Sequence, residues 1–285
     1  MSSIRNSMTS EPSIILATRI HLGKQSSPPD QSKLVKTLST FLQTATSINA
    51  SQALIAVDPQ EKIKGYDLVS SIEQALEEAT KSSQDQHCAI IKVSPWGSFV
   101  PALNALTSWA CKHQKEYGNT VIMFISAETS VTRETITDMS QHMADDTLVI
   151  GAALPGHEYK GDGSKDGTEV DLNGRTCPWN TSAMWNLNKL ALLGFPLVAD
   201  GLHQQEDGTP VAAGIEEFAT VLLHQRMDPG GSKAKLVKVV GVEWEQDFED
   251  EERRKWHEAK MKSKVTRAEV HRSLLGGGKG KVIHF

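Results

Sequence analysis

Cysteine, long apolar runs and secretory signals are scarce or missing in this chain of 285 residues. The three cysteines, Cys88, Cys111 and Cys177, are odd in number and widely spaced, which argues against a disulfide framework or a zinc knuckle. No apolar run reaches the length of about 18 residues that a membrane-spanning helix requires. The first 13 residues are polar and rich in serine, without the apolar stretch of a secretory signal. We therefore expect no membrane span and a cytoplasmic location.

An excess of basic residues is also lacking, since 30 Lys and Arg stand against 35 Asp and Glu, for a net charge of -5. Nucleic acid is therefore not expected as a partner. No G-x-G-x-x-G follows the first predicted strand, and no G-x-x-x-x-G-K-[ST] is present, which argues against dinucleotide binding and P-loop chemistry. The glycine-rich residues 276–280 follow no predicted strand and open no predicted helix.

The short apolar run Val-Ile-Met-Phe-Ile at residues 121–125 predicts a central strand of a sheet that is covered on both faces. Glu128 follows just past its carboxyl end. Ligands bind at that edge of open α/β sheets, so Glu128 is a candidate to hold a metal ion or a hydroxyl group. The structural alternative is a polar residue that ends a strand.

Strand and helix patterns alternate around this run. Further strands are predicted at 13–17, 53–57 and 88–93, and apolar residues at helical spacing predict helices over 34–45, 68–79 and 100–110. This alternation predicts an α/β protein with βαβ units and a mostly parallel, twisted sheet. Beyond it we expect helices at 133–143, 187–191 and from 215, an apolar run at 147–154 and an edge strand at 235–242.

Three segments are predicted to lie outside the packed core. Residues 1–12 predict a disordered lead, and residues 155–174, dense in Gly, Asp and Lys, predict a mobile loop beside the site. The main domain would cover 13–243. From 244 to 285 we expect a charged, solvated helix followed by a flexible tail that is rich in Gly and Lys.

Polar residues follow the ends of several predicted strands. Because these ends share one edge of a parallel sheet, a nucleotide-binding cleft is expected there. A carboxylate can accept from a base or ribose, a cation can offset diphosphate charge, and an acid can hold Mg²⁺ or Mn²⁺. The candidates are Thr18, Arg19, Asp58, Ser126 and Glu128.

Glu216 and Glu217 form a second acidic site, at the start of a predicted helix. Carboxylates are favoured there by the helix dipole, which is the structural interpretation. The functional one is that a member of the pair acts as general base towards an acceptor hydroxyl. Trp179 and Trp185 flank Asn180, and their indoles could stack on an acceptor or simply pack in the core.

The order of these parts resembles a GT-A glycosyltransferase domain of the family 2 type, over about residues 13–243. The motifs behind the resemblance are the strand ending in Asp58, the segment Val-Ile-Met-Phe-Ile-Ser-Ala-Glu, the later Trp-Asn-Thr with its Leu-rich helix, and Gly-Ile-Glu-Glu-Phe. It implies a three-layer sandwich around the sheet, with Asp58 contacting the base and Glu217 as catalytic base. Residues 126–128 fall at the Asp-x-Asp metal motif of that family. Ser126 replaces its first acid, so Glu128 alone would ligate Mg²⁺ or Mn²⁺, which makes a weak site.

Three hypotheses follow. The leading one is a transferase that binds a nucleotide-activated sugar and passes the sugar, with inversion, to an unknown acceptor. The second is a catalytically inactive GT-A-like binding or scaffold protein, motivated by the missing first acid and the charged segment 245–272. The third is a nucleotidyltransferase, for which the segment 18–24 is a poor match because it carries only Arg19, Gly23 and Lys24.

Overall fold

The computed structural model describes residues 12–22, 27–60, 62–80, 88–114, 119–201, 213–244 and 251–285. Of the predicted lead 1–12, only residue 12 falls within these ranges. Within them, the chain forms a sheet of nine strands in the order β3-β2-β1-β4-β8-β6-β9-β11-β7. Their bounds are β1 (Ser13–Ile20), β2 (Gln52–Val57), β3 (Cys88–Lys92), β4 (Thr120–Ile125), β6 (Thr147–Ala152), β7 (Thr168–Asp171), β8 (Ser182–Asn186), β9 (Lys233–Val237) and β11 (Lys281–His284).

The sheet is mixed but mostly parallel. Strands β8 and β7 run antiparallel to their neighbours, and every other pair in the sheet is parallel. The carboxyl ends of β1, β2, β3 and β4 therefore lie at one edge. A separate two-stranded sheet pairs β5 (Thr129–Val131), which directly follows β4, with β10 (Val242–Trp244).

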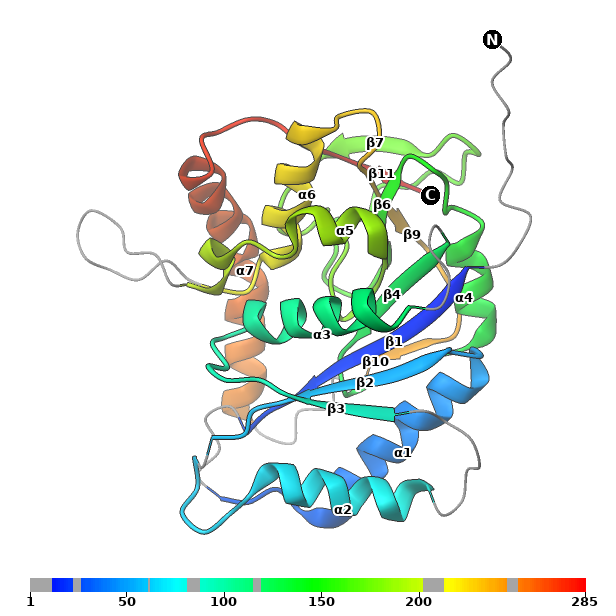
Figure 1. Cartoon of the computed structure of the whole chain (residues 1–285). Coiled ribbons are helices and arrows are strands. Elements are labelled where there is room, and N and C mark those ends of the chain that lie inside the picture. Colours follow the sequence, from blue (N-terminus) through cyan, green and yellow to red (C-terminus); the bar gives the residue numbers. More distant parts are fainter. Residues whose placement is uncertain are drawn as a thin grey trace, which may run out of the picture.

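Helices cover both faces of the sheet, as the predicted three-layer α/β architecture requires. Their bounds are α1 (Gln31–Ser47), α2 (Leu68–Thr80), α3 (Val100–His113), α4 (Arg133–Ser140), α5 (Leu187–Leu193), the 3-10 helix η1 (Leu197–Asp200), α6 (Glu216–Met227) and α7 (Glu251–Leu274). Figure 1 shows α1 and α2 on one side of β1 to β4, and α3 and α5 on the other. In the same view α7 runs along the side of the sheet at which β1 and β2 end. No helix of the described ranges is long and apolar enough to cross a membrane.

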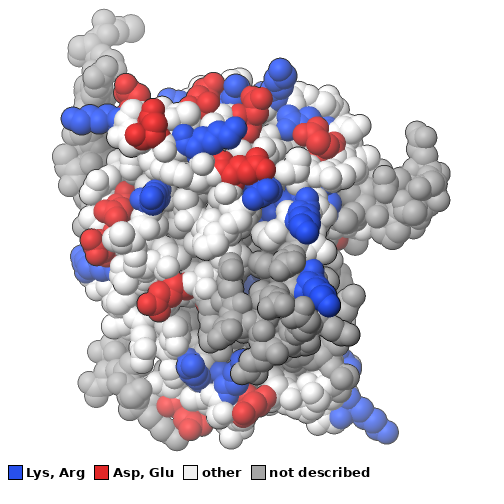
Figure 2. All heavy atoms as spheres, turned by 180° about the vertical axis from the view of Figure 1, so that it is seen from behind, with Lys and Arg blue, Asp and Glu red and all other residues white. Residues whose placement is uncertain are grey.

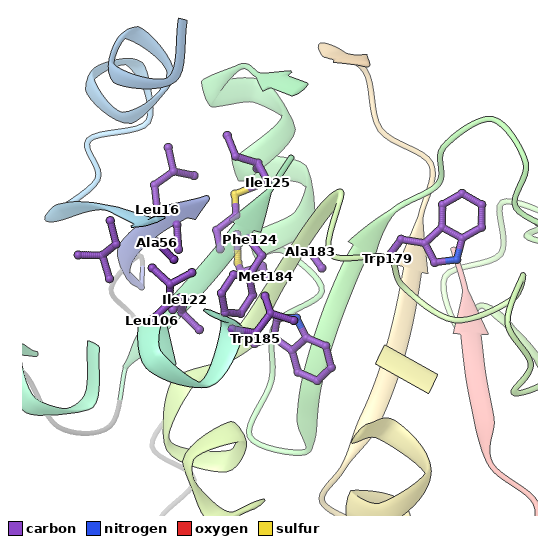
Figure 3. Close-up of a cluster of buried hydrophobic side chains, with 14 of the residues drawn as sticks. Leu16, Ala56, Leu106, Ile122, Phe124, Ile125, Trp179, Ala183, Met184 and Trp185 are labelled. Atoms are coloured by element: carbon purple, nitrogen blue, oxygen red, sulfur yellow. The ribbon is translucent and has the colours of Figure 1, made fainter. Parts of the chain in front are cut away.

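The core lies on both faces of the central strands. Every residue of β4 is buried, which explains its unbroken apolar run. Figure 3 shows Phe124 of β4 and Trp185 of β8 on the same side of the sheet as Leu106 of α3. Phe195 meets both rings edge to face, with centroids 5.7 Å from Phe124 and 5.2 Å from Trp185. Each fully buried side chain of this kind contributes about 1.5–3 kcal/mol to folding.

Several expectations for the second half of the chain are wrong. The strand expected at the edge, 235–242, is interior: β9 pairs with β6 on one side and β11 on the other, and 242–244 belongs to the separate small sheet. The expected mobile loop 155–174 contains the edge strand β7. Strand β8 was not predicted, because its five residues lead directly into α5 and resemble the start of that helix.

The C-terminal segment also differs from the prediction. The expected flexible tail ends in β11, which lies within the sheet, with Val282 and His284 fully buried. The expected solvated helix α7 packs against α6 and buries Lys264, Ala268 and His271. Four strand residues in a segment of glycines and lysines are too few to stand out as a strand pattern.

Candidate functional site

A cleft of about 1500 Å³ opens at the edge of the sheet where β1 and β4 end. Its walls come from these strand ends, α1, the start of α6, the β5–β10 pair and α7. Pockets for small ligands usually measure about 300–1,000 Å³, so this one has room for a larger molecule. The site residues expected from the sequence that line it are Thr18, Arg19, Ser126, Glu128, Asn180, Glu216 and Glu217.

Asp58 does not belong with them. It is buried at the end of β2, where its carboxylate pairs with Lys62 at 2.6 Å and accepts a hydrogen bond from the Gln60 backbone N–H at 3.1 Å. It is not among the described residues that line the cleft. In this structure the carboxylate is engaged by its own turn instead of being turned towards a ligand, which corrects the expectation that it lines the cleft.

Thr18 and Arg19 act differently although they are neighbours. The Thr18 hydroxyl donates to the Ile125 carbonyl at 3.0 Å and joins the ends of β1 and β4. The Arg19 guanidinium lies over the Phe99 ring, 4.8 Å from its centroid, and donates to the Ser98 carbonyl at 3.4 Å. Burial lowers the pKa of Arg19, and the neighbouring Glu216 and Glu217 oppose that shift. An arginine stays charged at any physiological pH, so the cleft has a fixed cation.

Asp200 at the end of η1 holds the loop that carries Phe99. Its carboxylate accepts backbone N–H bonds from Ser98 at 2.9 Å, Phe99 at 2.5 Å and Val100 at 2.8 Å. The Phe99 and Val100 N–H groups are unpaired donors at the start of α3, whose N-cap residue Phe99 makes no side-chain hydrogen bond. Asp200 therefore positions the aromatic ring beneath Arg19. Sequence analysis missed it because the contact spans about a hundred residues.

Glu216 and Glu217 open α6 and are almost fully buried, at 4% and 5% exposed. Glu217 Oε1 accepts a hydrogen bond from the Asn180 backbone N–H at 2.7 Å. Within the described ranges, Glu216 Oε2 and Asn180 Nδ2 have no hydrogen-bond partner. Burial, and then the charge of Glu217, raise the pKa of Glu216 to about 7. Two adjacent buried carboxylates resist double ionisation, so this pair holds a proton near neutral pH.

Helix α7 adds two cations that the sequence analysis left in solvent. Lys264 is only 6% exposed, lines the cleft, and places its ammonium 4.1 Å from the centroid of the Trp179 ring. Arg267 donates to the Ala213 carbonyl at 2.5 Å, just before Glu216. Burial lowers the pKa of Arg267, and Glu216 and Glu217 oppose this. The buried acid pair is thus close enough to the positive charges of Lys264 and Arg267 to interact with them.

The two tryptophans proposed as acceptor platforms are core residues. Trp179 is 2% exposed, stacks on His157 at a centroid distance of 3.6 Å and donates to the Gly174 carbonyl. Trp185 is fully buried and donates to Asn180 Oδ1 at 2.9 Å, which leaves the amide nitrogen of Asn180 for the cleft. Both indoles pack in the core, the second of the two interpretations given above, and in this structure neither presents a face to an acceptor. Trp244 of β10 is the half-buried tryptophan that does line the cleft.

The expected metal ligand stands without companions. Glu128 is exposed at the cleft wall, and the described residues contain no group of three His, Cys, Asp or Glu side chains that could hold a metal ion. The neighbouring Ser126 offers a neutral hydroxyl. Glu128 by itself is therefore a weak Mg²⁺ or Mn²⁺ site, because a single carboxylate needs ligand phosphates and waters to complete the coordination.

The surface that Figure 2 shows bears acidic and basic side chains interspersed with one another. Among the described residues of that face, neither sign gathers into one extended patch. Charged side chains of both signs also line the cleft, where Glu216, Glu217 and Lys264 are buried and Arg19 is half-buried.

No protein-family model matches the chain, and no curated protein sequence matches it. Solved structures do resemble it. A mannosyltransferase from Pyrobaculum calidifontis, solved with GDP-Man and Mn²⁺, has a TM-score of 0.51 at 10% identity over 79% of this chain, which spans 55% of that protein. A 4-diphosphocytidyl-2C-methyl-D-erythritol synthase from Anaerococcus prevotii has a TM-score of 0.44 at 10% identity, over 88% of this chain and 99% of that one.

A nucleoside-diphosphate-sugar pyrophosphorylase from Vibrio cholerae has a TM-score of 0.41 at 12% identity, covering 80% of this chain and 93% of that one. The likeness to the mannosyltransferase confirms the predicted GT-A-like fold of nucleotide-diphospho-sugar transferases. Because the identity is so low, it speaks for the fold alone.

Proposed function

We propose that this protein binds a nucleotide-activated sugar in the cleft and transfers the sugar to a hydroxyl group of an acceptor. The observation that carries the proposal is the buried pair Glu216 and Glu217, which faces the same cleft as Arg19 and Lys264. Two carboxylates that can accept a proton, next to cations, suit a reaction in which a hydroxyl loses its proton while a diphosphate departs.

Glu216 is the better base of the two. Its Oε2 atom has no hydrogen-bond partner in the described ranges, and its pKa of about 7 matches the optimum for a general base at neutral pH. Glu217 accepts the Asn180 N–H, which fixes its orientation. The family resemblance instead favours Glu217 as the base, so both carboxylates belong to the proposal.

The reaction would be a single displacement with inversion. The acceptor oxygen attacks the anomeric carbon and forms the new glycosidic bond. The bond from that carbon to the phosphate oxygen breaks, and the nucleoside diphosphate leaves with the electron pair. The acceptor proton passes to the carboxylate of Glu216. Trp244 and the free amide nitrogen of Asn180 lie at the cleft to receive the acceptor.

The test combines binding and turnover. UDP-glucose and GDP-mannose are titrated by calorimetry, and release of free nucleoside diphosphate is followed by chromatography, first with water as acceptor. At least one sugar nucleotide should bind. Glu216→Gln should lower turnover by about 10²–10⁴-fold while binding stays unchanged, because only proton transfer is removed. Glu217→Gln decides which acid is the base.

Failure of every sugar nucleotide to bind would contradict the proposal and favour the scaffold hypothesis. Equal turnover by wild type and both Gln variants would remove the base assignment. A nucleotidyltransferase is the second candidate, because Lys33 and Lys36 of α1 also line the cleft and could hold a third phosphate. That reaction would join a nucleoside triphosphate to glucose 1-phosphate and release pyrophosphate. An enzymatic assay for pyrophosphate detects it.

A further inference from the structure

Lys264 is a buried cation without a carboxylate partner. Among the described residues no ion pair within 4 Å joins it to Glu216, Glu217 or another acid, and its ammonium contacts the face of Trp179. Burial of an ammonium group is unfavourable unless nearby groups compensate it. The contact of the ammonium group with the indole face offsets part of that cost. Among the described residues no direct ion pair offsets the rest, so the ammonium group is suited to an anionic ligand in the cleft.

Arg19 has a similar environment at the end of β1, in the same cleft. Its guanidinium contacts an aromatic ring and a carbonyl, and in the described ranges it too forms no ion pair with an acid. Both cations nevertheless act on Glu216, whose pKa each of them lowers. The two positive groups, carried by residues far apart in the chain, therefore flank the same carboxylate and the same cleft.

A departing nucleoside diphosphate needs positive charge next to its phosphates, from cationic side chains, helix N-termini or metal ions. Here Glu128 is a single exposed carboxylate, whereas the buried Lys264 and the half-buried Arg19 are two cations that already line the cleft. Arg and Lys both bind phosphate oxygens, and burial strengthens that attraction. The cleft can therefore neutralise a diphosphate with its own side chains.

We propose that Lys264 and Arg19 form a cationic clamp for the diphosphate of the donor, which binds without a divalent ion and makes α7 part of the binding site. This inference rests on the proposed function, since it names the groups that hold the donor. The clamp adds a prediction that the proposed function does not make, namely that removal of metal leaves donor binding intact.

The experiment titrates UDP, GDP, uridine and guanosine into the full chain by calorimetry, in EDTA and in Mn²⁺. UDP or GDP should bind with the same affinity in both buffers. Lys264→Gln should weaken that affinity at least tenfold and leave the affinity for the nucleoside unchanged. Lys264→Arg should stay within about threefold of wild type, because it keeps the charge.

Lys262→Gln is the matched control, since Lys262 is exposed on the same helix and should bind as the wild type does. If Lys264→Gln does not fold, as judged by circular dichroism, Arg19→Gln gives the same test from β1. Binding that requires Mn²⁺ and is insensitive to both substitutions would overturn the clamp and leave the proposed function standing. Absence of UDP and GDP binding in both buffers would remove both.

Discussion

The buried acid pair links pH to stability through a single residue. Because the folded pKa of Glu216 is raised from 4.5 to about 7, the folded state holds a proton that the unfolded state releases. The contribution of Glu216 to the free energy of unfolding is fully favourable below about pH 4.5 and is lost as the pH rises through 7. Glu216→Gln removes this penalty, so the variant should gain stability over wild type, on the order of 1–3 kcal/mol at pH 8.

Urea unfolding of both proteins from pH 5 to 8 measures this. The gain should grow with pH up to about 7 and then level off, and Glu269→Gln, which changes an exposed acid of α7, should show no such trend. A gain that is independent of pH would mean that Glu216 is already ionised at pH 5.

Individual residues of the candidate site were predictable where a local pattern places them. Arg19 and Glu128 follow buried strands, and Glu216 and Glu217 open a helix after a loop, so position alone brought them to the cleft. Asp58 follows a strand as well, but Lys62 one turn later engages its carboxylate, a competition that spacing alone does not decide.

At the scale of elements, Asp200 is expected to stabilise the start of α3 from outside the helix. Asp200→Ala leaves three N–H groups without their charged acceptor and should cost about 1–3 kcal/mol of unfolding free energy. It should also weaken nucleotide binding, because Phe99 beneath Arg19 loses its support. Chemical denaturation and calorimetry measure the two effects.

The matched control is Asp67→Ala, which removes a similar local contact at the start of α2, where Asp67 accepts the Val69 N–H at 2.9 Å. This variant should lose stability and keep its affinity for nucleotides. Equal binding losses in both variants would mean that the effect reports general loosening and not the position of Phe99.

Helix α7 shows why charge composition misled the sequence analysis. Lys264, Ala268 and His271 are spaced four and three residues apart, so they share one helix face, and all three are buried. Two of the three are ionisable, and a hydrophobic pattern does not register such a face. Glu216, whose pKa Lys264 lowers, lies far away in the chain and becomes its neighbour only in the folded protein.

At the scale of the whole molecule, the parallel half of the sheet could be predicted and the other half could not. Strands β1 to β4 alternate with helices, which predicts that they are parallel, although their order in the sheet, β3-β2-β1-β4, is not their order in the chain. In the other half, β8 inserts antiparallel between β4 and β6, and β11 returns from the chain end to lie between β9 and β7. These pairings depend on long-range register, which local periodicity does not contain.

The return of β11 makes the last residues essential to the rest of the sheet. Val282 is fully buried, and the His284 imidazole accepts the Lys160 N–H at 2.9 Å through Nδ1 and contacts the Thr176 carbonyl at 3.1 Å through Nε2. Deletion of residues 281–285 would leave β9 with an unpaired edge and β7 without a neighbour. It would also release the end of α7, the helix that carries Lys264. We therefore expect the truncated chain to aggregate.

A single substitution tests the same idea in a graded way. Val282→Asp places an uncompensated charge in the sheet and should lower the unfolding free energy by several kcal/mol, with loss of nucleotide binding as α7 loosens. Lys281→Ala removes only exposed ion pairs to Asp171 and Glu169 and should change it by less than about 1 kcal/mol. Urea denaturation and calorimetry of both variants decide the matter. Wild-type stability in Val282→Asp would show that β11 is dispensable, because a strand held on both edges cannot accept a charge at its buried position without loss.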